Sequence, residues 1–240
     1  MTNNTPELTI VIPTKNEEQY IGKLLNSLLK QDYEYIAKIP LYIADAHSTD
    51  KTRAVIEKYT SRLNISVIPG GLPAEGRNAG AWRAATPYVL FIDADVELRD
   101  KKLIRKALQA MKEENLHCVT TNIVSSYGNM LANVLYFVHN IIQYGSRYVK
   151  PLSTGMFMLF DRQKFNELGG FNEKVLYGED YFLSKDIDRK KFKVLKNSYI
   201  VATSRRFKKM GYKKVAYLYL KAIKNYKDER FFYQDHKYWG

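Results

Sequence analysis

Two aspartates separated by one residue directly follow an apolar segment of the chain. Asp93 and Asp95 stand immediately after Tyr88–Ile92. Carboxylates at this spacing can bind a hard divalent cation, which usually keeps waters and bridges phosphate oxygens of a substrate. Because aspartate is also common in turns, the pair on its own indicates only a candidate metal site.

The first 95 residues predict a parallel sheet that would position these aspartates. Short apolar runs alternate there with segments whose apolar residues recur at helical spacing. Such alternation is typical of parallel strands joined by right-handed helical crossovers. The expected strands are residues 8–13, 39–44, 64–68 and 88–92. Of the three expected helices, one begins near residue 21, one begins near residue 50 and one spans 76–85.

Polar side chains follow these strands where each one ends. Ligands of parallel sheets bind beyond the carboxyl ends of the strands, so these side chains are expected to meet at one edge. The polar residues of this edge are Thr14, Asn16, Glu17, Asp45, His47, Ser48, Asp93 and Asp95, with Arg77 in the segment 76–80 between the third and fourth strands. The sequence therefore predicts a ligand site at this edge.

The second half of the chain has a less regular pattern. Residues 103–111, 130–148, 163–168 and 179–188 are expected to be helical, whereas 118–124, 155–160 and 192–202 are expected to be extended. The chain has no internal repeat, low-complexity tract or linker, and its 240 residues suit one continuous domain.

Six short motifs occur in an order that identifies a family. They are IVIPTKNE at 10–17, DAHSTD at 45–50, GRNAG at 76–80, FIDAD at 91–95, GGF at 169–171 and GED at 178–180. Over about residues 8–207 the chain resembles the family-2 glycosyltransferases, which are inverting nucleotide-sugar transferases of the GT-A fold. This resemblance implies an α/β fold with a Rossmann-like, mostly parallel central sheet, helices on both faces and a smaller mixed acceptor-side region.

The resemblance also implies a domain organisation and a nucleotide pocket. A GT-A domain would span 1–207, with a nucleotide-binding half at 1–95 and an acceptor half at 96–207, followed by a basic helix and tail at 208–240. The matching residues of the pocket would be Pro13, Thr14, Asn16, Glu17 near the ribose, Asp45 on the base and Arg77 on the nucleotide.

The catalytic roles follow from the same resemblance. Asp93 would lie near ribose and metal, and Asp95 would coordinate Mn²⁺ or Mg²⁺ against the diphosphate. Asp180 would be the general base that deprotonates the acceptor hydroxyl, with Glu179 beside it contacting acceptor or sugar. One carboxylate in reach of the hydroxyl is what such a proton transfer needs.

Two departures from the family bear on the function. Many relatives carry a histidine metal ligand after the last extended stretch, where this chain has Ser204-Arg205-Arg206. Guanidinium groups bind phosphate oxygens, so Arg205 and Arg206 are expected on the diphosphate; the alternative is a basic surface cluster. The chain also lacks the QxxRW motif of processive synthases, which favours a single transfer.

The net charge of +13 is concentrated in the tail. From residue 204 onward there are 11 basic and 3 acidic residues. Residues 212–226 form a basic amphipathic pattern, which fits either an interfacial helix on anionic lipid or an ordinary helix packed on the domain. The first interpretation favours a polyprenyl-linked acceptor. The single cysteine, Cys118, fits a reducing compartment, so we expect the cytoplasm or its membrane face.

Two other functions are compatible with parts of the sequence. A sugar-phosphate nucleotidyltransferase would share the sheet and the paired aspartates. Such enzymes usually have a glycine-rich loop after the first strand, whereas the loop Thr14–Glu17 contains no glycine. A nucleic-acid-binding protein would use the basic tail, but no signature of such proteins accompanies the charge. The favoured partners are therefore a UDP- or GDP-linked sugar and a glycan or polyprenyl-linked acceptor, with no nucleic acid.

Overall fold

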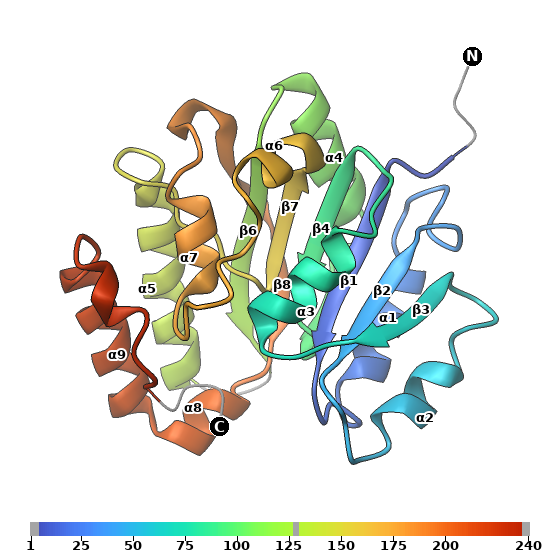
Figure 1. Ribbon diagram of the computed structural model, residues 1–240, viewed down its shortest axis with the longest axis horizontal. Coiled ribbons are helices and arrows are strands. Elements are labelled where there is room, and N and C mark those ends of the chain that lie inside the picture. The colour runs from blue at the N-terminus through green and yellow to red at the C-terminus, as the bar shows by residue number, and fades with distance from the viewer. Residues whose placement is uncertain (1–4, 127–129, 237–240) are drawn as a thin grey trace.

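One eight-stranded sheet forms the centre of the molecule (Figure 1). The computed structural model describes residues 5–126 and 130–236. The strands are β1 (Leu8–Thr14), β2 (Leu41–Asp45), β3 (Ile65–Pro69), β4 (Tyr88–Ile92), β5 (Val96–Glu97), β6 (Cys118–Ser125), β7 (Phe157–Asp161) and β8 (Phe192–Ala202).

The sheet is mostly parallel, as expected. Its order is β3-β2-β1-β4-β7-β6-β8-β5. The strands β1 to β4 pair in parallel, and β6 pairs in parallel with β8. The strand β7 runs antiparallel to both β4 and β6, and β5 runs antiparallel to β8. The parallel half and the mixed half confirm the predicted α/β class with a mixed second region.

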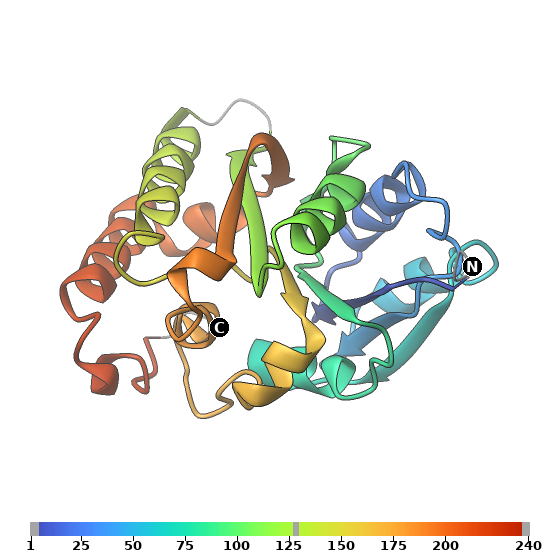
Figure 2. The same ribbon diagram turned by 90° about the horizontal axis from the view of Figure 1, so that it is seen from above.

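Helices cover both faces of the sheet, so it has two hydrophobic cores. Figure 2 shows α1 and α4 on one side of the strands and α3 and α6 on the other. The alternation of a strand explains this division: Ile10 and Ile12 of β1 belong to the first core, and Val11 between them belongs to the second. The helices are α1 (Ile21–Leu29), α2 (Thr52–Glu57), α3 (Pro73–Ala81), α4 (Leu103–Glu113), α5 (Met130–Ser146), α6 (Arg162–Glu167), α7 (Glu179–Ser184), α8 (Arg205–Met210) and α9 (Tyr212–Lys224).

Some boundaries differ from those predicted. The helix expected at 76–85 begins three residues earlier, because Pro73 takes its first turn and Glu75 accepts a hydrogen bond of 2.9 Å from the N–H of Leu72. The helix expected at 179–188 ends at Ser184. Neither α8 nor the two-residue strand β5 was expected.

The helices α5 and α9 lie side by side at the end of the molecule away from β3 (Figures 1 and 2). The Tyr219 hydroxyl of α9 lies 3.0 Å from Nδ1 of His139 in α5. The side chains of Tyr212 and Val215 pack against the first core. Over the part of the chain that the structure describes, no helix has both the length and the apolarity to cross a membrane. Residues 237–240 of the predicted tail lie outside the described residues.

Candidate active site

Hydrogen bonds connect the loops that follow β1 and β2 at the predicted edge of the sheet. Asn16 has a φ of +54°, which its short polar side chain tolerates better than most residues. Its side-chain oxygen accepts a 2.9 Å hydrogen bond from the N–H of Thr49, and its own N–H donates to Oγ of Ser48 at 2.9 Å. The N–H of Glu17 donates to Oγ1 of Thr52 at 2.7 Å. These bonds give the first loop a defined shape.

Asp45 lies buried at the end of β2. Its Oδ1 accepts hydrogen bonds from the N–H and the hydroxyl of Ser48, at 3.2 and 2.5 Å, and its Oδ2 lies 2.6 Å from Nε of Arg53. Burial alone would raise the pKa of Asp45, but the bonds from Ser48 and Arg53 outweigh it and hold that pKa below its ordinary value. The carboxylate is therefore held charged and fixed.

Arg77 is a fully buried arginine that joins the two halves of the chain. Its Nη2 lies 2.6 Å from Oδ1 of Asp93, and its Nη1 lies 2.6 Å from Oε1 of Glu179. The side chain of Arg77 is only 2% exposed. Burial disfavours its charge, yet the surrounding carboxylates outweigh burial and raise the pKa of Arg77. The guanidinium thus fixes the first aspartate of FIDAD relative to the GED motif.

Asp180 is held beside this pair by backbone groups. Its Oδ2 accepts a hydrogen bond of 3.0 Å from the N–H of Gly155, and its Oδ1 accepts one of 2.8 Å from the N–H of Tyr181. Burial raises the pKa of both Asp180 and Glu179. Glycine is required at 155, because a Cβ there would lie 2.2 Å from Nη2 of Arg77.

A second arginine joins the first loop to the other aspartate of the pair. Nη2 of Arg205 lies 2.5 Å from Oε1 of Glu17 and 3.3 Å from Oδ2 of Asp95. Thr203 donates its hydroxyl to the same Asp95 oxygen at 2.8 Å. Burial raises the pKa of Glu17 to about 7, although Arg205 opposes this. The guanidinium of Arg205, in the first turn of α8, therefore lies at the edge of the sheet.

The donor set can accommodate a divalent cation but is incomplete on its own. Among the described residues, no group of three or more His, Cys, Asp or Glu side chains could hold a metal. Asp95 is partly exposed, and its hydrogen bonds from Thr203 and Arg205 reach Oδ2 only. Mg²⁺ is commonly held by one or two carboxylates plus phosphates and water, so Asp95 and Asp93 fit such a site once a diphosphate is present.

The remaining predicted residues lie around these clusters. Thr14 is buried, and the Cα of Pro13 packs where α3 passes the sheet, 3.8 Å from the point where a Cβ on Gly76 would stand. Arg206 follows Arg205 in the first turn of α8 and is half-buried. His47 is exposed and has a φ of +55°, a conformation that favours glycine.

Several contributors were missed by sequence reasoning. The N–H of Gly155, the hydroxyl of Thr203 and the guanidinium of Arg53 each contact a predicted carboxylate. Ser48, which binds Asp45, differs from these three because it belongs to the polar cluster predicted after the second strand. The others come from segments that only the fold brings to the edge.

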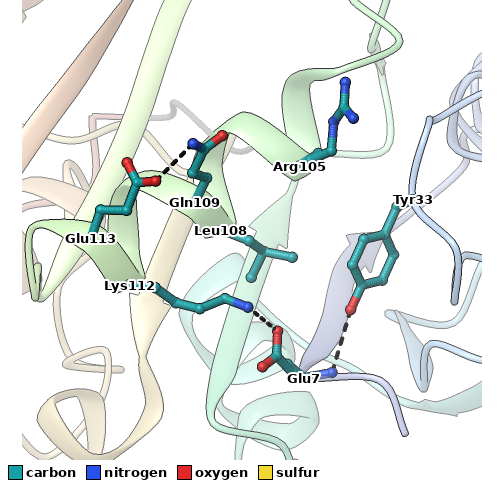
Figure 3. A pocket seen from close by; sticks show the side chains of 7 residues that line it. All are labelled: Glu7, Tyr33, Arg105, Leu108, Gln109, Lys112 and Glu113. Atoms are coloured by element: carbon teal, nitrogen blue, oxygen red, sulfur yellow. Dashed lines mark hydrogen bonds and ion pairs between the residues drawn. The ribbon is translucent and has the colours of Figure 1, made fainter. Parts of the chain in front are cut away.

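A pocket near the opposite edge is not a comparable site. Figure 3 shows it between α4 and the residues that precede β1, beside Tyr33. Its charged groups bind each other: Nζ of Lys112 lies 2.5 Å from Oε2 of Glu7, and Gln109 donates to Glu113 at 2.8 Å. Because Glu7 precedes β1, this pocket lies at the amino end of that strand, away from the aspartate pair.

The structure is that of an α/β protein with a cluster of carboxylates and arginines at one edge of its sheet, and comparison with known proteins gives the family. Residues 9–169 match the family described as Glycosyl transferase family 2, which is two thirds of the chain. The chain therefore belongs to glycosyl transferase family 2.

Curated relatives share part of the chain. It is 34% identical over 113 residues to the poly(ribitol-phosphate) beta-N-acetylglucosaminyltransferase TarS of Staphylococcus aureus, a match that covers 45% of this chain and 19% of TarS. It is 25% identical over 134 residues to the GalNAc(5)-diNAcBac-PP-undecaprenol beta-1,3-glucosyltransferase of Campylobacter jejuni, covering 52% and 41%. The chain thus spans less than half the length of these relatives.

Solved structures confirm the fold. The crystal structure of S. aureus TarS 1-349 with UDP-GlcNAc matches with a TM-score of 0.67 at 23% identity, covering 82% of this chain and 58% of that one. The mannosyltransferase PcManGT of Pyrobaculum calidifontis, in complex with GDP-Man and Mn²⁺, matches with a TM-score of 0.65 at 18% identity, covering 83% and 57%. The expected GT-A architecture is confirmed.

Proposed function

We propose that this chain transfers a sugar from a nucleoside-diphosphate sugar to an acceptor hydroxyl or a lipid phosphate, with inversion and in single steps. The observation that carries the proposal is the buried link from Asp93 through Arg77 to Glu179, next to Asp180. It ties the donor side of the site to the acceptor side at fixed distances. Family membership favours this activity over that of a nucleotidyltransferase.

The donor is proposed to be a UDP- or GDP-linked sugar. TarS and PcManGT have been solved with UDP-GlcNAc and GDP-Man, and both share this fold. The fixed carboxylate of Asp45 offers oxygens to a base, and the loop of Thr14, Asn16 and Glu17 would lie along the ribose. Pro13 would shape the wall of that pocket.

Charge on the leaving diphosphate is proposed to be stabilised from two directions. Asp95, with Asp93 nearby, would hold a divalent cation such as the Mn²⁺ bound by PcManGT, and that cation would stabilise the leaving group's charge. Arg205 would release its contacts with Glu17 and Asp95 and bind phosphate oxygens instead, since its side chain is 39% exposed and can change rotamer. Arg206 would assist from the same turn of α8.

Asp180 is proposed as the general base. Burial raises its pKa, which makes the carboxylate a better proton acceptor, while the N–H groups of Gly155 and Tyr181 aim its oxygens. A single base directing one in-line attack gives inversion. Glu179, bound to Arg77, would act as a positioning residue for Asp180 and contact the sugar or acceptor.

The acceptor is proposed to be a glycan or a polyprenyl-linked sugar. The named relatives act on poly(ribitol-phosphate) and on an undecaprenol-linked glycan. The cytoplasmic location stays a prediction from the sequence.

Ligand-induced stabilisation tests the donor. Thermal unfolding would be followed with UDP- and GDP-linked sugars, each with and without MnCl₂, because a ligand that binds only the native state raises the apparent stability. One nucleotide class should raise Tm, and Asp95→Asn should remove the Mn²⁺-dependent part of the shift. Asp186→Asn, at an exposed aspartate, is the matched control. Absence of any shift, or pyrophosphate release from a nucleoside triphosphate, would overturn the proposal.

A further inference from the structure

The exposed large hydrophobic side chains of this chain are gathered at one end of the molecule. Of the 17 such side chains among the described residues, 12 lie in segments 130–149 and 217–226. Scattered exposed apolar residues are ordinary, but a contiguous set marks an interaction surface. The first segment contains α5 and the second includes the C-terminal part of α9, and these two helices lie side by side (Figures 1 and 2).

The greater part of this surface belongs to α5. Its exposed apolar residues recur at the spacing of one helix face, opposite the buried Ala132, Tyr136 and Gln143. They are Met130, Leu131, Val134, Phe137, Val138 and Ile141, with exposed fractions between 41% and 76%. One face of α5 therefore packs on the domain, and the other presents aliphatic and aromatic side chains outward.

The apolar stripe of α9, which is the apolar side of the amphipathic pattern at residues 212–226, has a different role. Tyr212 and Val215 pack against the core, and Tyr219 contacts His139 of α5. The outward side of α9 carries Tyr217 and Leu220. Part of that stripe thus attaches α9 to the domain, while Leu220, Ile223 and Tyr226 stay exposed. The larger exposed apolar face lies next to α9, on α5.

The charged side chains within α5 and α9 are all of one sign. The segment of α5 contains no Asp, Glu, Lys or Arg. The segment of α9 contains no acidic residue, and its four lysines, Lys213, Lys214, Lys221 and Lys224, are all exposed. Ammonium groups beside an apolar helix face suit a surface that is apolar below and anionic at its boundary, which is the surface of an anionic membrane.

We propose that the exposed face of α5 docks on an anionic membrane, inserting its apolar side chains at the headgroup boundary while the lysines of α9 bind the headgroups. A second copy of the chain is a poorer occupant, because twofold pairing of this surface would bring lysines together with no acidic side chain in either helix. The α5 helix has 17 residues and lies on the surface of the domain, so it contacts the membrane without crossing it.

The docking surface borders the proposed base. Asp180 stands in the first turn of α7, and that helix packs against α9: Leu218 of α9 belongs to the same buried cluster as Phe182, and the Tyr181 hydroxyl donates to the carbonyl of Tyr226 at 3.5 Å. A docked α5 would therefore bring a lipid-linked acceptor close to Asp180. The docking itself does not depend on the proposed function and is measured without any donor.

Vesicle flotation tests the docking directly. The full chain would be mixed with vesicles of phosphatidylglycerol and phosphatidylcholine, or of phosphatidylcholine alone. Ile141→Glu should weaken partitioning to the anionic vesicles about tenfold or more, since burying an aliphatic side chain of this size is worth at least that factor. Val67→Glu is the matched control, because Val67 is 45% exposed on β3 at the other end of the molecule.

The lysines are tested separately. Lys213→Gln combined with Lys224→Gln should weaken binding to anionic vesicles and reduce its salt dependence, while circular dichroism confirms that every variant is folded. Three outcomes would overturn the proposal: wild-type chain that binds no vesicle, equal loss in the Val67 variant, or a wild-type dimer that Ile141→Glu dissociates without vesicle binding.

Discussion

Replacing Arg77 by methionine tests the central link of the site. The substitution keeps an unbranched side chain but removes the cation that binds Asp93 and Glu179 at 2.6 Å each. Glu179 is 4% exposed at its side chain, so water cannot replace the lost partner. Removing one partner of a buried ion pair costs about 3–5 kcal/mol in the free energy of unfolding, and we expect that loss at pH 8.

The loss should depend on pH. Burial and the charge of Asp180 raise the pKa of Glu179 above its ordinary 4.5, and Arg77 opposes both, so the variant's Glu179 has a still higher pKa. When a carboxyl group has a higher pKa in the folded state than in the unfolded state, the protein becomes less stable as the pH rises from the unfolded-state pKa to the folded-state pKa. The variant should therefore be closest to wild type near pH 5 and least stable near pH 8.

Urea denaturation at pH 5 and pH 8 measures both effects. Arg105→Met is the matched control, because Arg105 lies 3.0 Å from Asp32 with both side chains about half exposed, and exposed pairs contribute at most about 1 kcal/mol. Adding Glu179→Gln to Arg77→Met should recover part of the stability. A loss below about 1 kcal/mol at pH 8, or one equal to that of the control, would refute the reasoning.

Two further predictions concern single contacts. Gly155→Ala should lower stability by about 1–3 kcal/mol, because its Cβ would lie 2.2 Å from the clamped Arg77 guanidinium, whereas Gly145→Ala, with nothing within 4 Å, should be neutral or stabilising in thermal unfolding. Equal effects would contradict this packing. Glu17→Gln should flatten the pH dependence of stability between about pH 4.5 and 7, since burial raises the pKa of Glu17 to about 7 and its ionisation destabilises the fold over that interval. An unchanged profile in pH-dependent denaturation would contradict the burial of a charged Glu17.

The parallel half of the sheet was predictable because its signals are local. Each strand from β1 to β4 is a short, largely apolar run, and β1, β2 and β4 lead directly into the polar residues that form the edge. The early start of α3 was also readable, since Pro73 and Glu75 are first-turn residues. By contrast, β5 has only two residues and forms by pairing with β8, more than a hundred residues away in sequence.

The contacts of the site were less predictable than its residues. Arg77 and Glu179 are separated by 102 residues, and Glu17 and Arg205 by 188, so no local pattern reports these bonds. The burial of Arg77 depends on Gly155, just before β7, and on Glu179 of α7, which both lie against its guanidinium although they are distant in sequence. The exposure of α5 could not be predicted either, because an apolar helical pattern does not show whether the helix is buried in a core or lies on the surface.

Release of nucleoside diphosphate from the nucleotide sugar that stabilises the chain is the most direct test of the proposed mechanism. The rate would be compared between wild type, Asp180→Asn and the exposed control Asp186→Asn, with donor binding measured in parallel. We predict that Asp180→Asn loses at least a hundredfold in rate while donor binding persists, because general-base catalysis contributes roughly 10²–10⁴-fold. Wild-type turnover in Asp180→Asn, or an equal loss in Asp186→Asn, would contradict the assignment of the base.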